Sequence, residues 1–250
     1  MRFVYDEKEL EKFFNLILKP LEKDEVYFLS LSARNKYLTP EERVEYDLGR
    51  TEMMMRKLVK EYSFPAFLRT VRSYEIETGI SGRGFKTLPQ KCIAVYANIN
   101  VCSGKKALQE FDQNMNTIIF SMDRDAGAVE NLRYLDTELL NCFQRSRGAS
   151  TWLDIDFDSP DKDFGVDCVN VLIKDLTEHK VENHVVETRS GYHVLVKRAD
   201  LNYNYTETVK GLDQAMKHRF PEKAEVVVNK NEMCPIPGVL SAGFEVRMIR

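Results

Sequence analysis

Residues 152–158 read Trp152-Leu153-Asp154-Ile155-Asp156-Phe157-Asp158. Apolar and acidic side chains alternate along this stretch, and a period of two is typical of a strand with one buried face. On such a strand the apolar side chains point into a core while the aspartates share the opposite face. Adjacent like charges on one face are unfavourable unless a cation relieves them. The stretch therefore predicts a strand that carries a metal site, although a solvated acidic strand end explains the same pattern.

The segments that follow predict a sheet with two helices. We expect a helix at 164–179, a hairpin of strands at 184–188 and 192–197, a second helix at 206–220 and a strand at 224–228. This order of elements is typical of a ferredoxin-like or RRM-like sheet. The sequence therefore predicts an RRM-like module over about residues 146–250.

The preceding residues, up to about 145, predict an N-terminal α/β module packed on that sheet. Helices are expected at 6–19, 104–115 and 121–143, and strands at 25–32 and 91–96. Thr39-Pro40-Glu41-Glu42 predicts a helix start, and the helix is expected to run to about Glu61. Because no Gly/Ser/Pro-rich linker separates the halves, we expect one catalytic domain over residues 1–250, of class α/β (α+β), with its active site in the cleft between the modules.

The predicted hairpin turn brings polar side chains close to the aspartates. It reads Glu187-Thr188-Arg189-Ser190-Gly191-Tyr192-His193. A guanidinium, a hydroxyl and an imidazole that converge beside two carboxylates would bind a phosphate group well. A polar turn that simply faces water is the alternative interpretation of the hairpin.

Charge is unevenly distributed along the chain. The formal net charge is only -3, which disfavours a protein that merely coats nucleic acid. Residues 151–188, however, hold ten Asp and Glu against three Lys and Arg, whereas residues 63–109 hold seven basic residues against two acidic ones. An acidic site beside a basic stretch is what a metal-dependent enzyme acting on phosphates requires, because carboxylates hold the cation and basic side chains hold the polyanion.

Apolar runs are short and the five cysteines are scattered. No run approaches the roughly 20 apolar residues of a membrane span, and the N-terminus turns acidic within a few residues, unlike a signal peptide. The cysteines show no C-x-x-C pair, which disfavours structural zinc and a disulfide framework. We therefore expect a cytoplasmic protein without a membrane partner.

Two motifs together resemble a known superfamily. The D-x-D of Asp154 and Asp156, followed after a helix by Ser190-Gly191-Tyr192-His193, is similar to the first two motifs of the archaeo-eukaryotic primase superfamily. Further similarity, to virus- or plasmid-type primase-polymerases, lies in residues 29–38, 97–106 and the Pro-Gly segment at 233–240. The resemblance implies a primase-polymerase of a prokaryotic or virus-infected cell that makes or extends primers on single-stranded DNA from NTPs or dNTPs.

The resemblance also implies roles for individual residues. Asp154, Asp156 and His193 are expected to be catalytic, and the two aspartates are expected to hold Mg²⁺ or Mn²⁺. The expected nucleotide-binding residues are Arg189, Ser190, Gly191, His193 and Lys197. The basic stretch at residues 63–109, rather than the resemblance, supplies the expected template-binding residues Arg83, Lys105 and Lys106.

One motif departs from the superfamily pattern. The strand before the Pro-Gly segment should supply a third acid, and here the choice lies between Glu225, its only carboxylate, and Asn229 nearer the expected place. Because an amide is a poorer metal ligand, a non-catalytic nucleic-acid-binding replication module of the same fold is the main alternative. A phosphatase or nucleotide-sugar transferase is a further one, since D-x-D occurs there too. The short chain suggests that priming needs a helicase or an accessory primase subunit.

Overall fold

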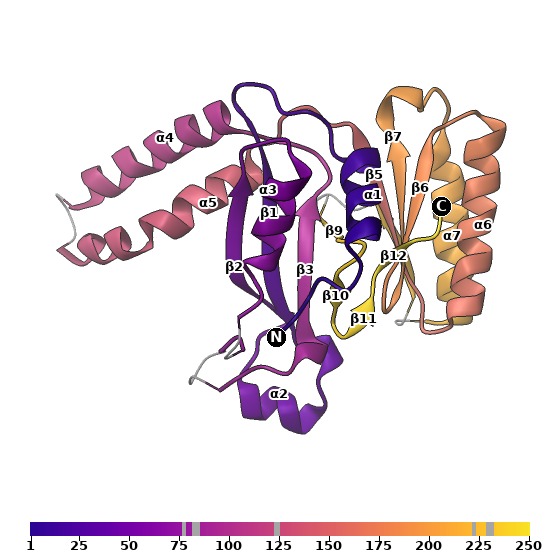
Figure 1. Ribbon diagram of the computed structural model, residues 1–250, viewed down its shortest axis with the longest axis horizontal. Helices are drawn as coiled ribbons and strands as arrows, with labels where there is room; N and C mark the ends of the chain where they lie inside the picture. Colours follow the sequence, from indigo (N-terminus) through magenta and orange to yellow (C-terminus); the bar gives the residue numbers. More distant parts are fainter. Residues whose placement is uncertain (77–78, 82–85, 123–125, 222–223, 229–232) are drawn as a thin grey trace.

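The chain folds into a mixed α/β structure with antiparallel sheets. The computed structural model describes all residues except 77–78, 82–85, 123–125, 222–223 and 229–232 (Figure 1). None of its helices, within these described residues, is long and apolar enough to cross a membrane.

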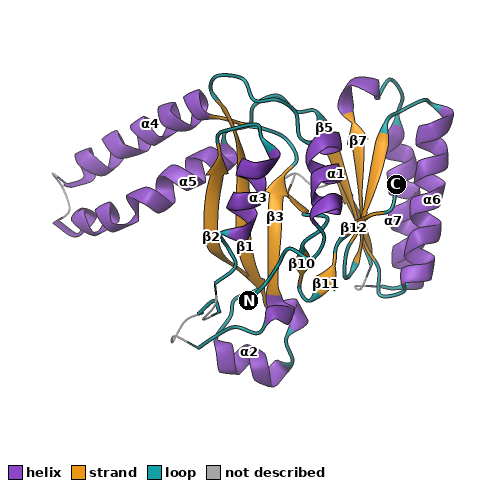
Figure 2. Cartoon of the chain, in the orientation of Figure 1, coloured by secondary structure: helices purple, strands orange, loops and turns teal. Residues whose placement is uncertain are grey.

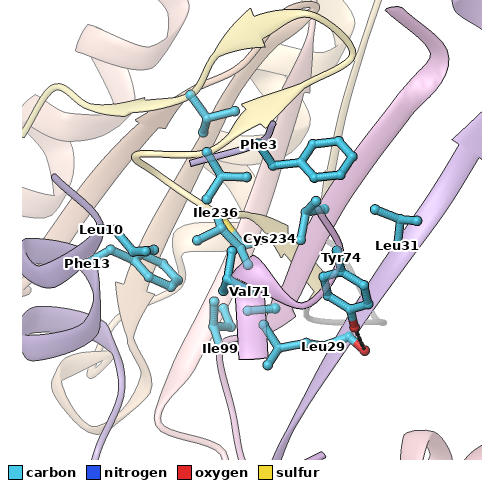
Figure 3. Close-up of a cluster of buried hydrophobic side chains, with 14 of the residues drawn as sticks. Phe3, Leu10, Phe13, Leu29, Leu31, Val71, Tyr74, Ile99, Cys234 and Ile236 are labelled. Atoms are coloured by element: carbon cyan, nitrogen blue, oxygen red, sulfur yellow. Dashed lines mark hydrogen bonds between the residues drawn. The ribbon is translucent and has the colours of Figure 1, made fainter. Parts of the chain in front are cut away.

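The first sheet belongs mostly to the N-terminal half. Its strand order is β2 (Thr51–Val59), β1 (Glu25–Arg34), β3 (Ile93–Asn98) and β9 (Met233–Pro235), and β4 (Cys102–Ser103) pairs with the start of β1. Helices α1 (Glu7–Ile17) and α3 (Phe64–Arg72) pack on one face around a large apolar core (Figure 3). Within it the hydroxyl of Tyr74 donates to the carbonyl of Leu29 at 3.0 Å.

A pair of helices extends away from the first sheet. Figure 1 shows α4 (Gly104–Met122) and α5 (Leu135–Arg145) running side by side to one side of the body. A 3₁₀ segment at Ala126–Tyr134 precedes α5, so the single helix expected at 121–143 is wrong. The helix expected at 104–115 exists and continues to Met122. The base of this pair packs on β1 through Val26 and Phe28.

The second sheet has the order β12 (Arg247–Met248), β6 (Asn183–Glu187), β7 (Gly191–Lys197), β5 (Trp152–Asp158) and β8 (Glu225–Val228). Helices α6 (Lys162–Glu178) and α7 (Tyr205–Arg219) cover one face (Figure 2). Leu153, Ile155 and Phe157 enter the core under these helices, while Trp152 and Leu195 on the other face join the core of the first module. The strand and helix order expected for residues 150–228 is therefore confirmed.

The last residues of the chain contribute strands to both sheets. Strand β9 joins the first sheet beside β3, a small hairpin of β10 (Leu240–Ser241) and β11 (Phe244–Glu245) follows, and β12 pairs with β6. Residues 233–235, which were expected to belong to the C-terminal module, thus pair with the first sheet, and the amide of Ala242 donates to the carbonyl of Ile93 at 2.6 Å. Strand β9 therefore forms one edge of the first sheet.

One predicted helix is shorter than expected. Thr39 caps the helix start and forms a capping box with Glu42, but helix α2 (Pro40–Tyr46) is followed at once by Asp47, which adopts the left-handed conformation with φ 46°. Residues 51–59 then form β2 instead of continuing the helix to Glu61. Pairing with the central strand β1 thus outweighs helix propensity, a long-range effect that a local pattern does not reveal.

The side chain of Asn100 connects the two modules by hydrogen bonds. Its Oδ1 accepts from the amides of Thr151 and Trp152 at 2.7 and 2.8 Å, and its Nδ2 donates to the carbonyl of Trp152 at 2.8 Å. Asn100→Ala would remove the side-chain acceptor of the Thr151 and Trp152 amides, while the carbonyl of Trp152 would keep its hydrogen bond from Nε of Arg198 at 3.2 Å. We expect the free energy of unfolding to fall by about 3 kcal/mol in urea titrations. Asn170→Ala, on the exposed side of α6, should change it by less than about 0.5 kcal/mol, and equal losses would contradict this role.

Candidate functional site

The aspartates of β5 form a row that faces the first module. Side-chain exposure is 0% for Asp154, 34% for Asp156 and 32% for Asp158. The expectation that they share a face opposite the apolar core is confirmed, because the alternate residues Leu153, Ile155 and Phe157 lie under α6 and α7. Asp156 and Asp158 are open to ligands, whereas Asp154 lies behind them.

His193 lies between two of these carboxylates. It is opposite Asp156 in the register of β5 and β7, deeper in the sheet than a position at the hairpin turn. Its Nδ1 lies 2.9 and 3.0 Å from the two carboxylate oxygens of Asp154, and its Nε2 lies 3.6 Å from Oδ1 of Asp156. Asp154 therefore orients the imidazole and leaves its Nε2 edge directed at Asp156.

The buried charges shift each other's titration. Burial alone would lower the pKa of His193, but Asp154 and Asp156 outweigh it and raise that pKa to about 9. Burial raises the pKa of Asp156 to about 6, opposed by the charge of His193 and reinforced by Asp158 and Asp154. At neutral pH the site therefore holds an imidazolium between carboxylates.

This arrangement predicts a pH-dependent stability in EDTA. Because the pKa of His193 is raised above its unfolded value of 6.5, its contribution is complete below pH 6.5 and is lost as the pH rises towards about 9. We expect the free energy of unfolding of the wild type to fall across this window in guanidinium titrations. His193→Gln should flatten the fall, and a wild-type stability that rises between pH 6.5 and 9 would contradict the raised pKa.

Basic side chains face the aspartates. Lys36, in the short helix η1 (Asn35–Tyr37), lies 3.6 Å from Oδ2 of Asp158 and donates to the hydroxyl of Ser190 at 3.2 Å. Arg189 donates to the carbonyl of Ala242 at 2.6 Å and lies over the ring of Tyr37, 4.7 Å from its centre. The hairpin turn and the first module therefore meet at this end of β5.

Arg34, at the end of β1, adds a third cation. It donates through Nη1 to the hydroxyl of Tyr96 at 2.9 Å. Its Nε is buried and has no hydrogen-bond partner within the part of the chain that the structure describes. Burial would lower the pKa of Arg34, but Tyr96, Tyr37 and Asp158 raise it, so the guanidinium stays charged.

Two adjoining cavities lie between the sheets, and both are lined by Arg34, Tyr96, Asp156 and His193. The larger, of about 430 Å³, is also lined by Glu225, Val227 and Met233. The smaller, of about 30 Å³, extends towards Lys36, Asp158, Arg189 and Ser190. We call this pair of cavities the inter-sheet site. It has carboxylates on the wall from the second sheet, and two of its three cations come from the first module.

Most residues expected from sequence meet in the inter-sheet site. Asp156, Arg189, Ser190 and His193 line it, Asp154 supports His193 from behind, and Gly191 pairs with Asp158 at its edge. Glu225 lies opposite Asp158 in the sheet register, whereas Asn229 is outside the described residues. Glu225 is therefore a carboxylate that the structure places in the same row.

The remaining expected residues lie elsewhere. Lys197 pairs with Trp152 at the opposite end of β7 and contacts Glu182, so its expected role in nucleotide binding is not supported by its position. Lys105 and Lys106 begin α4 beside the first residue of β1, roughly 30 Å along that strand from Arg34. Lys106 donates to the carbonyl of Arg147. Arg83 falls outside the described residues.

Sequence reasoning missed Arg34, Lys36 and Tyr96 as site residues. The first two lie within residues 29–38, a segment noted only for its similarity to primase-polymerases. The available signal was two cations directly after a strand. The packing of the two sheets, which brings Lys36 to Asp158 of β5, is not visible in local patterns.

The ligand chemistry of the aspartate row suits a hard cation. Mg²⁺ is commonly held by one or two carboxylates, with water and substrate phosphates as its other ligands. Asp156, with Asp158 or Glu225 beside it, offers such oxygens. Within the described residues no group of three or more His, Cys, Asp or Glu side chains is placed so that it could hold a metal ion by itself, so a cage made of protein ligands alone is not present there.

Comparisons with known protein families, curated proteins and solved structures find no match to this chain. Its function therefore has to be argued from the inter-sheet site itself.

Proposed function

We propose that this chain is a metal-dependent nucleotidyltransferase of the primase-polymerase type, which makes or extends primers on single-stranded DNA. The observation that carries the proposal is the inter-sheet site. There Asp156 and His193 face Arg34, with Lys36 and Arg189 at the adjoining wall. Carboxylates on one wall and cations on the other suit a metal-bound triphosphate.

The topology of the second sheet supports this family of folds. The order β6-β7-β5-β8, with α6 and α7 on one face, follows the split βαβ-βαβ arrangement of ferredoxin-like and RRM-like sheets. We propose that this is an RRM-like module and that the cavities between the sheets are the active-site cleft. Fold alone does not imply function, so the proposal depends on the side chains in the cleft.

The acidic wall would hold Mg²⁺ or Mn²⁺. Asp156 and Asp158 are the accessible carboxylates, and Glu225 is the third acid within the same strand register. A metal ion bound there would stabilise charge at the reacting phosphate and lower the pKa of the attacking hydroxyl. Asp154 would act through His193, which it holds by hydrogen bonds, and direct metal ligation by Asp154 stays a prediction.

The cationic residues would bind the triphosphate. Lys36 and Arg189 lie at the hairpin turn, and Arg34 has an unused buried donor. Charge-assisted hydrogen bonds from such groups are stronger than neutral ones. Because His193 carries a proton at neutral pH, it would donate to a phosphate oxygen rather than act as a base.

A non-catalytic nucleic-acid-binding module is the second candidate. The observation that favours it is the complete burial of Asp154. The superfamily pattern implies that Asp154 and Asp156 bind the metal together, but the accessible acids of β5 are Asp156 and Asp158. In such a module Asp154 and His193 would serve stability alone. Oligonucleotide binding without any synthesis would support this candidate.

The test is synthesis on a primed and an unprimed DNA template with NTPs or dNTPs and Mn²⁺ or Mg²⁺. We expect template-length product from the primed substrate in the presence of metal and none in EDTA. Product from the unprimed template only after addition of a helicase or accessory subunit would assign priming to the complex. Absence of product from the primed substrate in every combination would contradict the proposal.

A further inference from the structure

A basic groove lies outside the inter-sheet site, between the edge strand β2 and helices α3 and α5. Its volume is about 500 Å³, and its polar lining comes from Arg56, Lys57, Lys60, Arg69, Thr70 and Ser73. Among the residues that the structure describes, none that lines the groove carries a carboxylate. The groove is therefore positively charged, although the whole chain carries a net charge of -3.

Two of the four cations are held by neutral groups. Arg56 donates to the side chain of Asn141 and the carbonyl of Thr137, both in α5. Lys57 donates to the carbonyl of Ser73 at 3.4 Å and lies 5.3 Å from the ring centre of Tyr74. These contacts fix the two side chains without neutralising them by a direct carboxylate contact. The nearby Glu138 pairs instead with Arg145 at 2.9 Å.

The other two cations are open to solvent. Lys60, just after β2, and Arg69, on α3, are both exposed. In the described ranges of the chain neither has a carboxylate within ion-pair distance. A lysine on an edge strand is a common protection against strand pairing, which would account for Lys57 and Lys60. That explanation does not account for Arg69, which belongs to a helix and lines the same groove.

The groove adjoins the sheet face that leads to the inter-sheet site. Arg56 of β2 pairs with Ser30 of β1, and Ser30 pairs with Tyr96 of β3. Directly paired residues point to the same face, so Arg56 and Tyr96 lie two strand spacings apart, about 10 Å. Tyr96 lines the inter-sheet site. One end of the groove therefore lies close to the proposed catalytic cavity.

We propose that the basic groove binds the sugar-phosphate backbone of single-stranded nucleic acid. Arg56 to Lys60 spans about 13 Å along the strand, a length over which several successive phosphates fit. That this strand is the template entering the inter-sheet site rests on the proposed function, whereas phosphate binding by the groove does not.

Binding of fluorescent dT20 in EDTA, without nucleotide, tests the groove by anisotropy at several salt concentrations. Each phosphate contact with a single strand contributes about 0.7 to the slope of log affinity against log salt. Lys60→Ala with Arg69→Ala should therefore reduce that slope by about 1.4. The matched control, Lys174→Ala with Lys210→Ala, removes the same charge from exposed positions on α6 and α7 and should leave the slope unchanged.

Several outcomes separate this proposal from the proposed function. An unchanged slope in the groove variant, an equal reduction in the control, or equally groove-dependent binding of a dT20·dA20 duplex would overturn it. Thermal unfolding at the wild-type temperature establishes that the groove variant is folded. The wild type could also bind dT20 through the groove and yet make no product. That result would support nucleic-acid binding by the groove and contradict only the proposed catalytic function.

Discussion

The Asp156→Asn protein is expected to lose primed, template-directed synthesis by at least about 100-fold while keeping its fold. Asp156 is the accessible carboxylate that lines both cavities of the inter-sheet site, opposite Arg34. The amide preserves the shape of the side chain but removes the charge that would hold Mg²⁺ or Mn²⁺. Metal stabilisation of a reacting phosphate contributes several kcal/mol, and each 1.4 kcal/mol corresponds to about tenfold in rate. Initial rates of primer extension measure the loss.

The matched control for this variant is Asp163→Asn. Asp163 is an exposed acid in the first turn of α6 and lines neither cavity of the inter-sheet site. We expect its extension rate to equal that of the wild type. Retention of wild-type rate by Asp156→Asn, or an equal loss in both variants, would remove Asp156 from the mechanism. Unfolding curves of both proteins show whether any loss is structural.

Gly191→Ala is expected to destabilise the protein by about 3 kcal/mol or more. A Cβ at this position would stand 1.7 Å from the carbonyl oxygen of Phe157, which is backbone and has little freedom to move. Gly191 pairs with Asp158 in β5, so relief of the clash would separate the strands at the end that carries the aspartate row. Urea unfolding measures the change in free energy.

Gly211→Ala serves as the control for a glycine-to-alanine change. Gly211 lies inside α7, and a Cβ there meets no atom within 4 Å beyond its chain neighbours and the backbone of its own helix. Alanine favours a helix interior over glycine by roughly 1 kcal/mol, so this variant should be more stable than the wild type. If Gly191→Ala were as stable as Gly211→Ala, that result would contradict the close contact between Gly191 and the carbonyl of Phe157.

The second sheet was predictable because its signals are local. Alternation along 152–158 gave both the strand and the two faces that the structure shows, and the glycine before Tyr192 gave the hairpin. These patterns depend on side-chain period and turn chemistry, which neighbouring residues alone determine. The convergence of Ser190, Arg189 and His193 near the aspartates followed from the same pairing.

The first sheet was less predictable because its contacts are distant in sequence. Residues 51–59 appeared helical, since only the pairing with β1 makes them a strand. The hydrogen bond between His193 and Asp154 was missed for a related reason, because it depends on the register of β5 and β7, which places His193 opposite Asp156. Likewise, Arg34 and Tyr96 become site residues only when β1 and β3 pack opposite β5.

The most direct test of the account is a crystal of the wild type soaked with Mn²⁺ and a nucleoside triphosphate. We expect an anomalous manganese peak beside Asp156 and phosphate oxygens, with the triphosphate against Arg34, Lys36 and Arg189. Such a structure would also show whether Glu225 or Asn229 completes the metal site. A fully occupied triphosphate outside the inter-sheet site, or manganese bound away from Asp156, would contradict the assignment of the inter-sheet site as the nucleotide- and metal-binding site.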